Sequence, residues 1–234
     1  MLSVSWPILA TSGVVEAPGY SLTDPYTMIV VLVFLSLAPF FAMMVTSYLK
    51  LVVVFNLIRN ALGIQQIPPT TVLNGLAMVV SFYIMAPVAQ DTYDIIHQSS
   101  FAGKDWIGIK DVIYESKGPL QNFLYKHSAQ SDRKFFVQSA KLLWPEHRHT
   151  DVKETDLIVL IPAFTVSELG SAFQIGFLVY LPFVMIDIIV SNILLALGMM
   201  MISPTVISLP FKLLLFVLVS GWSRLIQGIV LTYK

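Results

Sequence analysis

The chain has 234 residues, of which 56% are hydrophobic, and it carries no cysteine and a formal net charge of zero. This composition is far more apolar than that of soluble globular domains, and it excludes disulfides, Fe–S centres and thiol catalysis. Basic and acidic residues are balanced and form no basic stripe, so nothing indicates a nucleic-acid partner.

The charged residues are concentrated in one part of the chain. Of the 28 Asp, Glu, Lys and Arg residues, 19 lie between Asp91 and Asp156, whereas residues 26–49 and 60–90 contain none. Segments this apolar cannot have water as their main solvent. The sequence therefore predicts an all-α chain that lies in a membrane or inside a hydrophobic assembly. We expect multi-pass hydrophobic helical hairpins and one small polar helical segment outside the membrane.

The N-terminal residues 1–26 have no basic residue before their apolar part, which a secretory signal needs, so we expect an uncleaved and poorly ordered lead-in. The first apolar block follows at residues 27–58 and exceeds the ~20 residues that cross a bilayer. We expect Pro39 to kink this block and Lys50 to mark where it leaves lipid or snorkels.

A turn separates this block from a second one at residues 71–89, because the Pro68-Pro69 pair cannot continue a helix. Residues 27–89 therefore predict a helical hairpin. Lys50 and Arg59 have no acid nearby, which favours a cytoplasmic position for the turn.

Residues 90–156 differ in kind, since they carry mixed charges, all four histidines and several turn signals among apolar anchors. We expect a small, folded, helical segment outside the membrane rather than a disordered linker. His147 and His149 flank Arg148 in a charged, turn-rich stretch that gives no held ligand geometry, so no metal site is predicted.

Residues 157–234 form the C-terminal hydrophobic part. The block at residues 157–197 is long enough to favour two crossings over one, and the loop at residues 198–204 leads to a last block at residues 205–222. Hydropathy therefore predicts four or five spans, and no inverted repeat relates the two halves.

Three charges, Glu168, Asp187 and Lys212, lie well inside apolar sequence. A charge at the bilayer centre costs ~2.5–3.5 kcal/mol on insertion scales. One reading is a snorkelling lysine with two protonated or locally hydrogen-bonded carboxylates. We favour the other, in which these helix faces meet one another, other subunits or a water-filled path.

Small residues surround Glu168 at Ser167, Ser171 and the Ala172-x-x-x-Gly176 pair. Such residues let helix backbones approach closely, although small residues are also common in apolar helices generally. Together with Glu168, the pattern indicates an interface that keeps lipid away from the carboxylate.

The loop Gly198-Met199-Met200-Met201-Ile202-Ser203-Pro204 places three flexible thioethers between a glycine and a proline. Chemistry alone favours methionine as a filler in a buried loop over a functional seal. No Ser/His/Asp set, P-loop or Gly-rich phosphate motif is present, so the sequence offers no catalytic site.

Five stretches together resemble one known family. They are RNALGIQQIPPTTVLNGLA (59–77), FYIMAPV (82–88), LIPAFTVSELGSAFQIGF (160–177), LPFVMIDIIVSNILLALGMMMISP (181–204) and LPFKLLLFVLVSGW (209–222). They are similar to the FliP/SctR (YscR-like) family, core export-apparatus proteins of type III secretion systems. The segment FFVQSAKLLWP (135–145) and the motif IQQIPP (64–69) resemble the injectisome branch more than the flagellar one. The first stretch carries what we take as the family's loop motif, Arg59, Asn60, Gln65, Gln66 and Pro68.

This resemblance implies a homo-pentamer joined by FliQ/SctS-type and FliR/SctT-type membrane proteins, with a SctU/FlhB-type switch protein as a further partner. The assembly would enclose a pore through which unfolded secretion substrates cross the bacterial inner membrane. Much of it, residues 90–156 included, would lie on the periplasmic side, in contact with membrane lipid only in part. No enzymatic activity, cofactor or metal is implied.

The family's methionine gasket would fall on Met199, Met200 and Met201, with Gly198 and Pro204 as hinges of the loop. Two departures stand out: Gly170 occupies a position where the family usually has Lys, and Ser220 one where it usually has Asp. If those charges form an intersubunit ion pair elsewhere, uncharged packing replaces it here at little cost.

Two other functions remain open from the residues alone. A multi-pass small-solute or ion-coupled transporter could use Glu168 and Asp187 as coupling carboxylates, although repeat symmetry is missing. An intramembrane hydrolase would need a base at membrane depth, and all four histidines lie in the polar segment.

Overall fold

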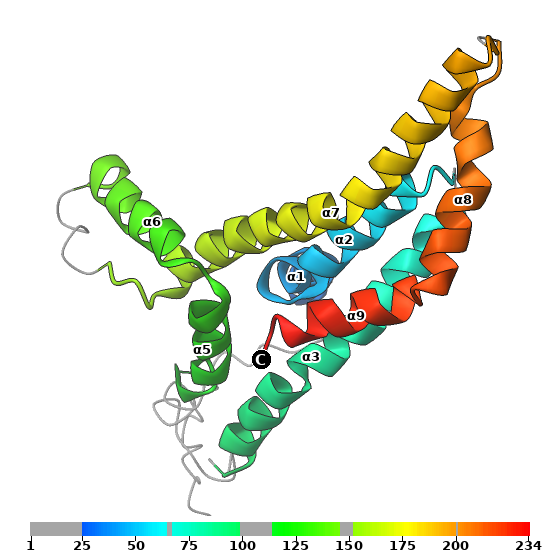
Figure 1. Ribbon diagram of the computed structural model, residues 1–234. Coiled ribbons are helices and arrows are strands. Elements are labelled where there is room, and N and C mark those ends of the chain that lie inside the picture. The colour runs from blue at the N-terminus through cyan, green and yellow to red at the C-terminus, as the bar shows by residue number, and fades with distance from the viewer. Residues whose placement is uncertain (1–24, 65–66, 99–113, 146–151, 200) are drawn as a thin grey trace, which may run out of the picture. The chain divides into compact units, whose positions relative to one another are not determined.

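The computed structural model describes residues 25–64, 67–98, 114–145, 152–199 and 201–234. Within these ranges every regular element is a helix, which confirms the predicted all-α fold. In chain order the helices are α1 (Pro25–Val45), α2 (Tyr48–Ala61), α3 (Thr70–Gln98), α5 (Gly118–His127), α6 (Gln130–Leu143), α7 (Leu157–Ala196), α8 (Pro204–Leu218) and α9 (Gly221–Leu231) (Figure 1). Most of the predicted lead-in, residues 1–24, lies outside the described residues.

The chain divides after Phe40 into two compact units, residues 1–40 and 41–234. Most of α1 belongs to the first unit. Its large apolar side chains, from Met28 to Leu37, are exposed. An apolar helix with this surface needs lipid or another chain around it.

The first apolar block is interrupted later than predicted. Helix α1 continues through Pro39 and ends at Val45, and α2 begins at Tyr48. At the break the Thr46 hydroxyl donates to the Ala42 carbonyl (2.7 Å), and the Ser47 hydroxyl donates to Ser81 on α3 (3.0 Å). These hydroxyls offer the backbone and the neighbouring helix an alternative to a continuous helical ladder.

Helix α2 forms the centre of the second unit. Leu51, Val54, Phe55 and Ile58 are completely buried, at the i, i+3, i+4 and i+7 spacing of one helix face. This face packs among α3, α7 and α9, which Figure 1 shows alongside α2. Burial of each such side chain contributes ~1.5–3 kcal/mol to the stability of the fold. Helix α2, although it is the less apolar part of the first block, therefore holds the bundle together.

The predicted turn separates α2 from α3, and the polar segment is mostly helical where it is described. Helix α3 starts directly after Pro68-Pro69 and continues past the apolar block to Gln98, into the polar segment. Within that segment α5 and α6 form, and both pack on α7. Phe123 and Leu124 of α5 bury against Leu160 and Phe164 of α7, in a second, smaller core.

Helix α7 corrects the prediction of two crossings within residues 157–197. It is one continuous helix of 40 residues, with Pro162 and Pro182 inside it. At ~1.5 Å per residue it extends ~60 Å, about twice the hydrocarbon thickness of a bilayer. Hydropathy measures the length of an apolar run and cannot tell one long helix from two short ones.

Helices α8 and α9 are bent by 59° at the residues between them. In the described part of the chain, α1, α3 and α7 are long and apolar enough to span a membrane, and the bent α8–α9 pair is a fourth candidate. Four candidates agree with the lower of the two predicted counts. The fifth predicted span came from dividing the block at residues 157–197, which the structure shows to be the single helix α7.

Candidate functional site

One buried ion pair joins the two central helices. The Lys50 ammonium on α2 lies 2.8 Å from a Glu168 carboxylate oxygen on α7, and both side chains are almost completely buried. The Tyr233 hydroxyl, just after α9, donates a hydrogen bond to the other oxygen of Glu168. We call Lys50, Glu168 and Tyr233 the Glu168 cluster, which connects three elements distant in sequence.

Aromatic rings enclose the Glu168 cluster. Lys50 lies 4.3 Å from the centre of the Tyr233 ring, a favourable cation–π contact. On α5, Phe123 stacks on Tyr233 at a centroid distance of 6.1 Å, and His127 contacts the same ring at 5.0 Å. The polar segment is therefore packed directly against the charged centre of the hydrophobic bundle.

The position of His127 makes this contact sensitive to acid. The pKa of His127 is lowered from 6.5 to about 4, mainly by burial and in addition by the positive charges of Lys126 and Lys50. A detached imidazole accepts a proton below about pH 6.5, whereas the packed one stays neutral until about pH 4. The stabilisation from packing α5 is thus complete above pH 6.5 and decreases as pH falls toward 4.

We expect amide hydrogen exchange in α5, corrected for intrinsic rates, to become faster at pH 5 than at pH 7. His127→Phe keeps a ring against Tyr233 but removes the titration, so it should abolish most of this difference. His97→Gln, at an exposed histidine on α3, is the matched control. A pH dependence that persists in His127→Phe would assign it to another group.

A second polar network lies where α7 and α8 face each other. The Lys212 ammonium of α8 binds Asp187 of α7 at 2.6 Å and the Ala61 carbonyl at 3.2 Å. The Ser208 hydroxyl donates to the other oxygen of Asp187 at 2.5 Å. Because Ala61 is the last residue of α2, Lys212 also neutralises the negative end of that helix. We call Asp187, Ser208 and Lys212 the Asp187 network.

The small residues near Glu168 lie at helix contacts. Ala172 and Gly176 are buried, and a Cβ on Gly176 would lie 2.3 Å from a methyl carbon of Leu57 on α2. The Ser167 hydroxyl accepts a hydrogen bond from the Ala129 amide (2.8 Å) and lies 2.6 Å from Asp132, which anchors α6. Ser171 is half-buried beside them.

The methionine loop begins at a well-formed helix end. Gly198 has a φ of +74°, the Gly198 amide donates to the Leu195 carbonyl, and the Met199 amide donates to the Leu194 carbonyl. These two bonds form a Schellman motif, which favours glycine at this position. Pro204 then occupies the first turn of α8, where its missing N–H costs nothing.

The loop side chains point outward from this chain. Met201 is 99% exposed and Met199 is 46% exposed, while Met200 lies outside the described residues. Sequence chemistry favoured a buried filler, and the isolated chain does not bury Met199 or Met201.

The loop between α2 and α3 is described in part. The Arg59 guanidinium donates to the Thr70 hydroxyl across the turn (2.8 Å), and Asn60 is exposed. Pro68 is half-buried, whereas Gln65 and Gln66 lie outside the described residues. Among the described residues no group of His, Asp and Glu could hold a metal ion, and His147 and His149 lie outside them.

The sequence profile of the FliP family matches residues 31–229, which is most of the chain. The chain belongs to the FliP family. It is 49% identical over 212 residues to the Yop proteins translocation protein R of Yersinia pestis, covering 91% of this chain and 98% of that protein.

Two further relatives have similar coverage. The hypersensitivity response secretion protein HrcR of Ralstonia nicotianae is 48% identical over 210 residues (89% of this chain, 97% of the relative). The virulence protein YscR of Salmonella typhimurium is 46% identical over 216 residues (92% and 100%). These relatives confirm the predicted family and its injectisome branch.

Both positions that were predicted to depart from the usual family residue can be located. Gly170 is exposed on α7, and no atom lies within 4 Å of the position its Cβ would take. Ser220 caps α9 in the left-handed conformation, with a φ of 53°. Asp tolerates that conformation better than most residues, so the usual Asp suits this backbone independently of any ion pair.

The structure pairs two of the predicted charges, Asp187 and Lys212, with each other, and it joins Glu168 to partners that sequence reasoning missed. Glu168 and Lys212 do not contact each other, and Lys50 and Tyr233 were not predicted for the cluster. Lys50 is 3% exposed and paired with Glu168, so the expectation that it snorkels is wrong, whereas the expectation that it marks where the block leaves lipid stays a prediction. Because the charge of Lys50 is buried inside the protein, it no longer supports a cytoplasmic position for the turn. In the sequence, the isolated position of Lys50 in an apolar block was the one sign that this residue has a buried partner.

Proposed function

We propose that this FliP-family chain is a core subunit of a type III secretion export gate in a bacterial inner membrane. The observation that carries the proposal is the family match over nearly the whole chain, together with relatives named for Yop translocation and hypersensitivity-response secretion. Five copies would join FliQ/SctS-type and FliR/SctT-type proteins, with a SctU/FlhB-type switch protein nearby. The substrates would be unfolded effector and needle proteins, and the chain would have a structural rather than an enzymatic role.

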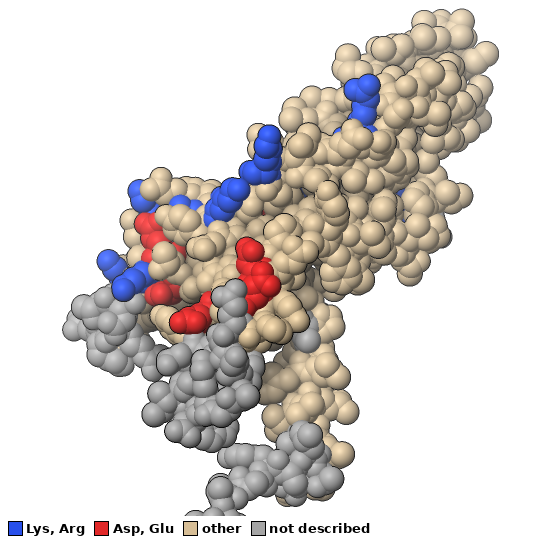
Figure 2. Space-filling model, turned by 90° about the horizontal axis from the view of Figure 1, so that it is seen from below, with Lys and Arg blue, Asp and Glu red and all other residues tan. Residues whose placement is uncertain are grey.

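Exposed apolar surface supports an assembled state. Along α7 a series of large apolar side chains is uncovered: Phe173, Phe177, Leu178, Leu181, Met185, Ile188, Ile189 and Ile193. On the face shown in Figure 2, charged side chains gather toward one end and wide areas carry none. Patches of this extent mark contacts with protein or membrane. Neighbouring copies and lipid would therefore cover α7, and the polar helices α5 and α6 would lie outside the membrane on the periplasmic side.

The methionine loop would seal the resting pore. Met199 and Met201 project from the turn between α7 and α8, so copies arranged in a ring could bring equivalent loops together. Thioether side chains are flexible and repack readily, which suits a ring that blocks ions at rest and yields to a passing polypeptide. Gly198 and Pro204 would fix where the loop leaves and re-enters the helices.

The test replaces Met199, Met200 and Met201 together by Ala. We expect the purified assembly, reconstituted in liposomes without substrate, to pass ions severalfold faster than the parent, because Ala leaves the closed ring open. Met185→Ala is the matched control, since Met185 is also exposed but lies along α7 rather than in the loop. A triple variant that assembles normally and leaks no more than the parent would contradict the seal.

A further inference from the structure

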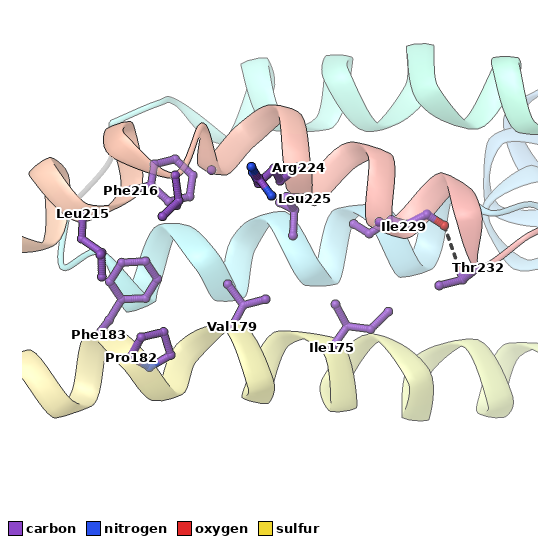
Figure 3. A pocket seen from close by; sticks show the side chains of 13 residues that line it. Ile175, Val179, Pro182, Phe183, Leu215, Phe216, Arg224, Leu225, Ile229 and Thr232 are labelled. Atoms are coloured by element: carbon purple, nitrogen blue, oxygen red, sulfur yellow. Dashed lines mark hydrogen bonds between the residues drawn. The ribbon is translucent and has the colours of Figure 1, made fainter.

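An open apolar cleft separates α7 from the α8–α9 pair. Its volume is about 560 Å³, within the ~300–1,000 Å³ typical of ligand pockets. Figure 3 shows Ile175 and Val179 of α7 pointing across it toward α9, with Leu225 and Ile229 on the opposite side. Apart from Arg224 and Thr232, the lining is hydrocarbon.

Arg224 is the charged residue among those that line the cleft. Within the described part of the chain its guanidinium makes no hydrogen bond or ion pair, and the side chain is exposed. Guanidinium groups bind phosphate through paired N–H donors. An arginine beside a hydrocarbon cleft therefore suits a ligand with an anionic end and an apolar body.

The start of α9 adds further donors at the same end of the cleft. Gly221, its first residue, also lines the cleft, and Ser220 provides no side-chain cap for the first amides. Uncapped N–H groups at a helix N-terminus favour an anion. Arg224 and this helix end thus offer one anion two kinds of donor.

Charge argues against an apolar helix of a second copy as the occupant. Helices α1, α2, α8 and α9 contain no Asp or Glu, and the acids of α3 lie near its polar end. The acids of α7, Glu168 and Asp187, are already paired with Lys50 and Lys212. An apolar helix of another copy could fill the cleft, but it would leave Arg224 without an anion.

We propose that this cleft binds one anionic phospholipid, with an acyl chain between α7 and α9 and the phosphate on Arg224. Both α7 and the bent α8–α9 pair are candidate spans, so acyl chains have direct access to the cleft. Paired donors between membrane helices are a known way of holding lipid headgroups. A lipid bound there would fill the space between α7 and the bend that joins α8 to α9, and it would thereby stabilise that bend.

The test uses Trp222, whose ring contacts Phe216 of the cleft lining at 5.5 Å. Trp6, Trp106 and Trp144 are changed to Phe, so that Trp222 is the only tryptophan of the chain. The full chain, in its detergent-extracted assembly, is titrated with phosphatidylglycerol brominated along the acyl chain. We expect saturable quenching, weaker with the same brominated phosphatidylcholine, reduced severalfold in Arg224→Gln and largely retained in Arg224→Lys.

Gly228→Leu tests the cleft itself. Gly228 lines the cleft and no atom lies within 4 Å of the position of its Cβ, so Leu should fill the space without a clash. Quenching should fall in this variant and persist in Gly170→Leu, where the added side chain also meets no neighbour.

Three results would overturn the proposal. If both lipids quench equally and Arg224→Gln does not change the quenching, the quenching comes only from bulk lipid around the helices. Quenching that appears only after the assembly dissociates would show that another copy covers the cleft. An unchanged titration in Gly228→Leu, with the assembly intact, would place the lipid elsewhere.

Discussion

Lys50→Met is expected to destabilise the chain strongly, because it leaves the Glu168 carboxylate buried without its ammonium partner. Glu168 is 2% exposed, so water cannot replace Lys50. Removing one member of a buried pair typically costs ~3–5 kcal/mol. At ~2–4 °C per kcal/mol for a chain of this size, the melting temperature in detergent should fall by roughly 10 °C.

The matched control for this prediction is Arg59→Met. Arg59 is on the same helix, but its side chain bonds Thr70 at the surface, so its loss should cost no more than ~1 kcal/mol. A double variant, Lys50→Met with Glu168→Met, should recover most of the lost stability, because apolar packing can replace a buried pair. Equal melting temperatures for Lys50→Met and Arg59→Met would mean that Glu168 does not depend on Lys50.

The helical fold and its turns could be predicted because their signals are local. Pro68-Pro69, which precede α3, and the Gly198–Pro204 loop, which separates α7 from α8, mark helix boundaries through backbone chemistry that is visible in a few residues. The break at Thr46–Ser47 has no such clear signal. The Thr46 hydroxyl bonds locally to the Ala42 carbonyl, but the bond of the Ser47 hydroxyl depends on Ser81 of α3 lying opposite. Sequence patterning therefore placed the interruption at Pro39, which α1 accommodates.

The Glu168 cluster could not be predicted because its members come from three distant parts of the chain. Glu168 was recognised as a charge that needed a partner, and that much follows from the cost of burying it. The identity of the partners depends on how α2, α7 and the end of α9 meet. Two signals of these contacts are visible in the sequence: the isolated charge of Lys50 and the small residue Gly176, a site of close helix approach.

Gly176→Leu should separate α2 from α7 and weaken the core packing and the Lys50–Glu168 ion pair, which depend on the contact between these two helices. A Cβ at this position would lie 2.3 Å from the Leu57 methyl carbon and 3.2 Å from the Leu57 Cβ, so the outer end of a leucine cannot be accommodated by rotating Leu57 alone. Overpacking of this kind costs ~1–3 kcal/mol. The loss should be larger than for Gly176→Ala, where Leu57 can rotate and the helix gains from Ala.

The measurement is resistance of the detergent-extracted chain to protease, together with its melting temperature. Gly170→Leu is the control, because it adds the same side chain to the same helix where no neighbour lies within 4 Å. Adding Leu57→Ala to Gly176→Leu should restore part of the stability, since it removes the atoms that the new side chain meets. Because Lys50 and Glu168 span the same two helices, Gly176→Leu and Lys50→Met should not be additive. Full additivity would show that the helix approach and the ion pair stabilise the chain independently.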